Sequence, residues 1–223
     1  MYQFIGRRCL WAVGLSAGFA VASAAADTIP LGGGWQASIN NASNVGIVVD
    51  AVGADFVLIQ ISKDFTDPPG VGGVFPPVLI DFQQVDTDAN TKPNIIINDE
   101  TVTNLTGVSW SDFHWAVFDS GQAWFDVPAS AGFDTSPFGN QVFDDPGGVF
   151  GDANKATDLW VDGGVLPNNA SFFPGAASGQ LAMGIDLSSN NPVSFTLKEF
   201  PTPEPTTALL LGLLGAFGLR RRK

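Results

Sequence analysis

Short apolar segments that alternate with polar residues, each bounded by turn residues, set the strongest limit on how this chain can fold. Val193, Phe195 and Leu197 alternate with polar neighbours, and residues 181–187 show the same period. A period of two places one face of a β-strand in a core and the other toward solvent. The 26 glycines and 15 prolines leave little room for long helices. We therefore expect an all-β chain.

Further segments fit this pattern and recur at intervals of roughly ten residues. They are Trp35–Ile39, Val45–Val52, Asp55–Ser62, Val78–Val85, Asn94–Asn98, Trp110–Phe118 and Gln122–Val127. The spacing predicts a single antiparallel β-sandwich, jelly-roll-like or Ig-like, over residues 27–199. Residues 188–192 predict a hairpin loop between the last two strands. Residues 128–158, rich in Gly, Pro, Phe and Asp, are expected to form a long loop with one short helix.

The first 26 residues contain the three parts of a secretory signal peptide. Arg7 and Arg8 are basic, residues 10–21 are apolar, and Ala24 and Ala26 fit a signal-peptidase site. We expect signal peptidase to cleave after Ala26. The arginine pair keeps the twin-arginine export route as an alternative.

Removal of both ends would leave a strongly acidic body. Residues 27–205 contain four lysines and all 22 acidic residues, which gives a formal net charge of −18, against −12 for the whole chain. Nucleic-acid binding depends on clustered Lys and Arg that contact phosphates. We therefore expect no nucleic-acid partner.

The last 21 residues combine three elements in order. They are the motif Pro203-Glu204-Pro205, the uncharged run 206–219, and the basic cluster Arg220, Arg221, Arg222 and Lys223. As a helix, the run would be about 21 Å long, short of a hydrocarbon core about 30 Å thick. The basic end would face the cytoplasm. We expect transient insertion of this short apolar helix in the inner membrane, with a plain membrane anchor as the alternative.

This ending resembles the PEP-CTERM sorting signal of exported bacterial proteins, with residues 200–223 as a Pro-rich linker and sorting segment. The resemblance implies that an exosortase-type membrane enzyme recognises Pro203-Glu204-Pro205 and removes the tail. The body would then be released or attached at the surface of a Gram-negative cell. The resemblance further implies a structural or adhesive role in the extracellular matrix or biofilm. Residues 104–114 are similar to a stretch found in many such proteins.

Groups suited to catalysis are few. His114, the only histidine, follows Asp112 on one strand face, and we expect this pair to be a structural hydrogen bond. No G-x-S-x-G elbow follows a strand. Glycosidases need paired carboxyl groups, but Glu204 belongs to the sorting motif, Glu199 approaches the linker, and Glu100 has no evident partner. We expect no enzymatic activity, and a polysaccharide hydrolase is the least favoured alternative.

Oxygen ligands for one weak Ca²⁺ site are spaced along Asp86, Asp88 and Asn90, as in the first half of a calcium loop. The second half of the loop pattern is missing, so a solvated turn is the alternative. Other acidic residues could gather a second weak cation site, namely Asp144, Asp145, Asp152 and Asp158. We expect no other cofactor.

Exposed tryptophans would let the body bind sugars, because an indole face stacks on a sugar ring. Strand alternation places Phe113, Trp115 and Val117 on the core side and Trp110 on the opposite face. Trp110 and Trp124 are the candidate stacking residues. They make a carbohydrate-binding module of the cell surface, with extracellular polysaccharide as ligand, the alternative function.

Overall fold

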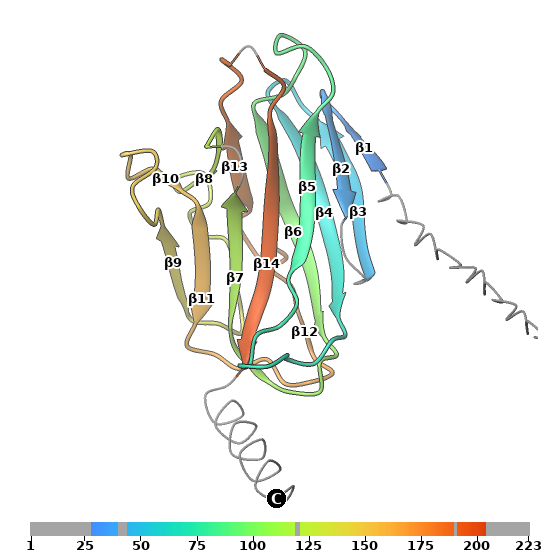
Figure 1. The fold of residues 1–223 in the computed structure, drawn as a ribbon, viewed down its shortest axis with the longest axis vertical. Coiled ribbons are helices and arrows are strands. Elements are labelled where there is room, and N and C mark those ends of the chain that lie inside the picture. Colours follow the sequence, from blue (N-terminus) through green and yellow to red (C-terminus); the bar gives the residue numbers. More distant parts are fainter. Residues whose placement is uncertain (1–27, 40–43, 119–120, 190, 204–223) are drawn as a thin grey trace, which may run out of the picture.

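The computed structural model describes residues 28–39, 44–118, 121–189 and 191–203, and it is all-β across them (Figure 1). Within these ranges, fourteen strands form two sheets rich in antiparallel pairs. No described residue lies in an α-helix, so the described part of the chain contains no helix that could cross a membrane. The expected signal peptide with Ala24 and Ala26, and the tail from Glu204 onward, lie outside the described residues.

Sheet A has the strand order β1-β2-β5-β14-β7-β11-β9. Its strands are β1 (Thr28–Gly32), β2 (Trp35–Ile39), β5 (Val78–Gln84), β14 (Ser194–Pro203), β7 (Trp110–Phe118), β11 (Asp158–Asp162) and β9 (Asn140–Asp144). Every neighbouring pair in this sheet is antiparallel. Figure 1 shows β14 in the middle of the sheet, between β5 and β7.

Sheet B has the order β10-β8-β13-β6-β4-β3, and β12 also pairs with β6. Its strands are β10 (Lys155–Ala156), β8 (Ala123–Asp126), β13 (Leu181–Ile185), β6 (Asn94–Asn104), β4 (Phe56–Phe65), β3 (Asn44–Val52) and β12 (Ser171–Phe172). β4 and β6 run parallel, whereas the sequence predicted antiparallel pairs alone. The cause is the connection, because β5 crosses to sheet A between them and β6 re-enters sheet B in the direction of β4.

The core lies between the two sheets and is rich in aromatic side chains. Phe65 of β4 meets Trp110 of β7 edge to face, with ring centroids 5.3 Å apart. Phe172 of β12 meets Phe113 of β7 in the same manner at 5.2 Å. Such pairs contribute about 0.5–1.5 kcal/mol beyond their buried area. They fix how sheet A packs on sheet B.

A β-bulge in β7 reverses the expected orientation of Trp110. Asp112 pairs with Thr202 of β14, and Trp110 pairs with the next residue, Pro203, so Ser111 is an extra residue. An extra residue moves the side chains beyond it to the other face of the sheet. Trp110 therefore lies in the core, where it is 0% exposed.

The expected hairpin between the last two strands is wrong. β13 pairs with β6 and β8 in sheet B, whereas β14 pairs with β5 and β7 in sheet A. Alternation indicates which side chains of a strand are buried, but it does not identify the neighbouring strand. The two strands contribute to one core from opposite sides.

The region expected as a long loop with a short helix contains strands and turns instead. β9 and β10 lie within residues 128–158, and none of these residues is helical. At the chain's other boundary, β14 continues to Pro203, four residues beyond the limit expected at residue 199. The pairing of β14 with β5 ends at Glu199, and beyond it the described strand pairs with β7 alone. Pro201 and Pro203 have no N–H group to donate, and they are tolerated here because one side of the strand has no described partner strand.

Candidate functional site

The outer face of sheet A carries three ring side chains from adjacent strands. Trp160 of β11 and Phe200 of β14 each lie directly opposite His114 of β7 in the strand register. The His114 ring is nearly parallel to Phe200, with centroids 4.8 Å apart, and to Trp160 at 6.5 Å. All three side chains are half-buried. We call them the ring row (Trp160, His114, Phe200).

Asp112 fixes one end of this surface through hydrogen bonds. Its Oδ1 accepts a hydrogen bond from the Thr202 backbone N–H at 2.7 Å, and its Oδ2 accepts one from the Thr202 hydroxyl at 2.5 Å. His114 Nε2 lies 3.5 Å from Oδ2. Burial acts to raise the pKa of Asp112, but the hydrogen bonds from His114 and Thr202 outweigh burial and lower it. The Asp112–His114 pair expected from the sequence is present, and Asp112 is ionised at neutral pH.

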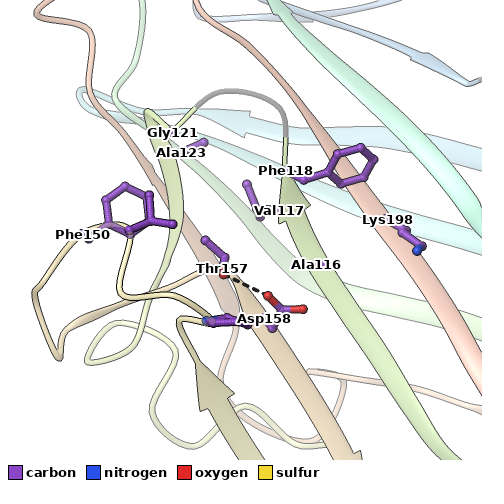
Figure 2. Close-up of a pocket in the computed structure, with 11 residues that line it drawn as sticks. Ala116, Val117, Phe118, Gly121, Ala123, Phe150, Thr157, Asp158 and Lys198 are labelled. Atoms are coloured by element: carbon purple, nitrogen blue, oxygen red, sulfur yellow. Dashed lines mark hydrogen bonds between the residues drawn. The ribbon is translucent and has the colours of Figure 1, made fainter.

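A pocket of about 470 Å³ is lined by residues of β7, β11 and β14, among them Phe118, Asp158 and Lys198 (Figure 2). Figure 2 shows Phe118 and Phe150 on opposite sides of it, with Thr157 and Asp158 between them. The Thr157 hydroxyl donates a hydrogen bond to Asp158 Oδ2 at 2.9 Å. Lys198 of β14 also lines the pocket.

The ring row and the pocket belong to one surface. Asp158 precedes Trp160 by two residues on β11, and Lys198 precedes Phe200 by two on β14, so both occupy the next position on the same strand face. Lys198 Nζ lies 4.5 Å from the Phe200 ring centroid. Aromatic rings beside one carboxylate and one ammonium group can bind a sugar through apolar contact and hydrogen bonds to hydroxyls.

Neither tryptophan chosen from the sequence offers an open ring face. Trp110 is wrong as a stacking residue, because it is buried and its Nε1 donates a hydrogen bond to Thr106 Oγ1 at 3.2 Å. Trp124 is half-buried, and Lys155 Nζ lies 3.7 Å from its ring centroid. The indole also packs so closely on Gly184 that a Cβ there would lie 2.7 Å from Nε1.

The sequence reasoning missed Trp160 and Phe200. Trp160 lies between the buried residues Leu159 and Val161, and this alternation indicates a short strand with Trp160 on its outer face. The residues on either side of this strand lack such a pattern, so the strand is hard to recognise from the sequence. The sequence pattern places Phe200 in the linker of residues 200–223, although Phe200 continues the alternation of β14.

The candidate calcium ligands Asp86, Asp88 and Asn90 form a turn held by its own hydrogen bonds. Asp86 Oδ1 accepts hydrogen bonds from Thr87 N at 2.7 Å and from Asn90 Nδ2 at 3.3 Å. Asp88 Oδ1 accepts one from Gln84 Nε2 at 2.7 Å. Across the described residues, no three His, Cys, Asp or Glu side chains are grouped to hold a metal, and this includes Asp144, Asp145, Asp152 and Asp158. Calcium binding stays a prediction.

Three charged side chains meet in the core, which the sequence reasoning did not foresee. Lys63 and Glu100 are each 1% exposed, and Glu199 is 0% exposed. Lys63 follows Ile59 and Ile61 at the inward positions of β4. Glu100 faces inward because Ile97 pairs with Ile59 and Asp99 with Gln60, which leaves an extra residue in β6.

Comparisons of this chain with protein-family models, with curated proteins and with solved structures found no match. Its function is therefore inferred from its own residues and their geometry.

Proposed function

We propose that this protein is an exported, non-enzymatic structural or adhesive component of the extracellular matrix or biofilm of a Gram-negative bacterium. Signal peptidase removes residues 1–26, and the apolar segment after Pro205 enters the inner membrane only transiently. An exosortase-type enzyme then recognises Pro203-Glu204-Pro205 and detaches the tail. The body that remains is a β-sandwich of jelly-roll-like or Ig-like character.

The end of β14 carries this proposal. The last described strand, β14, reaches Pro203, the first residue of the Pro-Glu-Pro motif, and all fourteen described strands precede Glu204. Cleavage at the motif would therefore leave every described strand in the body.

The placement of the carboxyl groups supports a non-enzymatic role. Glu100 and Glu199 lie in the core, where an external substrate cannot reach them. Asp112 is held by Thr202 and His114. Paired carboxyl groups that act on polysaccharide would need to line an open cleft.

Mass spectrometry of the protein from its own cell envelope tests the sorting proposal. We expect a mature chain that begins at Asp27 and ends within residues 203–205. A Glu204→Ala variant should retain the tail, and Thr206→Ala, just outside the motif, serves as the matched control that is processed normally. A wild-type chain that keeps Lys223 in the envelope would contradict sorting and favour a plain membrane anchor.

A second function, carbohydrate binding, is favoured by the ring row and its pocket. The ligand would be an extracellular polysaccharide that contacts Trp160 and Phe200 and is hydrogen-bonded by Asp158 and Lys198. We expect Trp160→Ala to weaken retention of the protein on polysaccharide from the producing cells at least several-fold. Trp124→Ala, at an indole already covered by Lys155, is the control and should bind as wild type. Equal retention of all three proteins would exclude the ring row as the binding surface.

A further inference from the structure

The buried cluster of Lys63, Glu100 and Glu199 joins the two sheets at one point. Lys63 comes from β4 and Glu100 from β6, both in sheet B, whereas Glu199 comes from β14 in sheet A. The side chains of Lys63, Glu100 and Glu199 are completely shielded from solvent. With all three ionised, the cluster would hold two negative charges and one positive charge inside the core.

The two carboxyl groups have different surroundings. Lys63 Nζ donates a hydrogen bond to Glu100 Oε1 and also contacts Glu199 Oε2. Trp115 Nε1 donates a hydrogen bond to the other Glu100 oxygen at 3.0 Å. Neither oxygen of Glu199 accepts a hydrogen bond in the described part of the chain, and its Oε2 forms an ion pair with Lys63 Nζ. Glu100 is thus held in place, and Glu199 faces Lys63 alone.

Burial favours the uncharged forms of this cluster. Charged groups removed from water are costly unless they are fully paired, and one lysine cannot neutralise two carboxylates. Burial lowers the pKa of Lys63 to about 8, although the charge and hydrogen bond of Glu100 act to raise it. A proton moved from Lys63 to the carboxyl group that lacks hydrogen bonds would give a neutral amine beside a neutral Glu199 acid.

Aromatic rings pack beside the Lys63 amine. Lys63 Nζ lies 5.9 Å from the Phe113 ring centroid, and Phe113 packs edge to face on Trp115 at 4.7 Å. A dry, fixed arrangement of this kind favours reaction between neighbouring groups, because no water competes and no motion is needed to bring them together.

We propose that Lys63 and Glu199 become joined by an intramolecular amide bond, an isopeptide cross-link between the two sheets that forms once the chain has folded. The lone pair of Lys63 Nζ attacks Cδ of Glu199, and a C–N bond forms. Glu100 accepts a proton from Nζ and delivers it to the hydroxyl group of Glu199. The C–O bond then breaks, and one water molecule leaves.

The roles of the two glutamates follow from their contacts. Glu100 keeps its position through Trp115 while it transfers the proton, which is the requirement for a general acid–base group. After the reaction, the new amide N–H lies beside Glu100 and can donate a hydrogen bond to it. The condensation removes two ionisable groups from the core and leaves one carboxylate with two donors.

The mass of the folded full chain tests the cross-link whether or not the tail is processed. This mass is measured under denaturing conditions, and the N- and C-terminal residues of the chain are identified. We expect this mass to be lower, by one water molecule, than the mass calculated from the sequence between those two residues. Trypsin should fail to cut after Lys63, and the peptide that begins at Glu199 should appear joined to the peptide that contains Lys63. A full sequence mass, with separate peptides, would overturn the proposal.

Other ways to lose water are separated by the peptide map. A succinimide at Asp162-Gly163 would give the same intact mass without linked peptides, and that result would also overturn the proposal. A link from Lys63 to Glu100 would overturn the roles assigned to the two glutamates. The linked peptide must therefore be sequenced and not only weighed.

Variants test the role of Glu100. Glu100→Gln keeps the shape of the side chain but cannot accept the proton, so this chain should fold and keep its full mass. Lys63→Arg, which cannot condense, should also keep its full mass, whereas Lys198→Arg at a surface lysine should still lose one water. Circular dichroism shows which variants fold. If the folded Glu100→Gln chain still loses water to the same link, Glu100 does not transfer the proton.

Discussion

Replacement of Trp110 by alanine should destabilise the fold severely. The side chain is 0% exposed, and its ring lies edge to face with Phe65 at 5.3 Å and with Phe75 at 6.1 Å. Truncation of a buried tryptophan to alanine costs about 3–5 kcal/mol in free energy of unfolding. The several aromatic partners place Trp110→Ala at the upper end of that range. Domains of this size typically have a free energy of unfolding of about 5–15 kcal/mol, so the variant would lose a large part of its stability.

Urea unfolding followed by far-UV circular dichroism measures this loss. With an m value of about 2 kcal/mol/M, a loss of 4 kcal/mol lowers the midpoint by about 2 M. Trp110→Phe keeps the ring contacts but removes the hydrogen bond to Thr106, and should cost about 1–2 kcal/mol. Trp160→Ala, at a half-buried position on the outer face, is the matched control and should cost less than about 1.5 kcal/mol.

The comparison with Trp160 makes the result decisive. If Trp110→Ala shifts the midpoint by less than about 0.5 M, or no more than Trp160→Ala does, Trp110 is not buried and the bulge at Ser111 is misassigned. Such a result would restore Trp110 as a candidate for sugar stacking.

Three further predictions concern single side chains. Gly184→Ala would place a Cβ 2.7 Å from Trp124 Nε1 and should cost about 1–3 kcal/mol in urea unfolding, whereas Gly139→Ala, whose nearest neighbour lies 3.8 Å away, should be tolerated. The lowered pKa of Asp112 means that its carboxylate stabilises the fold above about pH 4 and loses this effect as pH falls through the lowered value. Asp112→Asn should therefore flatten the acid side of the stability–pH curve. Burial lowers the pKa of Lys63 to about 8 in the folded chain, below its usual value of 10.5, so the unfolded chain holds this proton to higher pH. In a Glu100→Gln chain, where Lys63 is unlinked, the free energy of unfolding should therefore rise with pH up to 10.5. A cross-linked wild-type chain has no free Lys63 amine and should lack this rise.

Local alternation predicts much of the fold because burial on one face is a local property of a strand. Trp35–Ile39 and Trp110–Phe118 form strands with the bounds expected from the sequence. The prediction of a hairpin between β13 and β14 is wrong because the pairing of a strand depends on contacts between residues distant in sequence. The predicted outward orientation of Trp110 is wrong because one extra residue, Ser111, shifts the alternation of the strand, and the sequence carries no sign of this bulge.

The candidate site was predicted only where its residues are neighbours in sequence. Asp112 and His114 share a strand face, as two residues at that spacing should. Trp160 and Phe200 reach His114 from two other strands, so no sequence spacing relates them. Lys63 and Glu199 each continue an inward series in their strands, and a charge at such a position is the signal that sequence reasoning could use in other chains.

The place of β14 determines when the fold can be completed. It is the last described strand in the chain, yet it fills the middle of sheet A between β5 and β7. Until residues 194–203 are available, β5 and β7 each keep an unpaired edge, and unpaired edges recruit other chains. Synthesis from the N-terminus delivers this strand near the end, so the partly folded body depends on protection from aggregation until the final strand arrives.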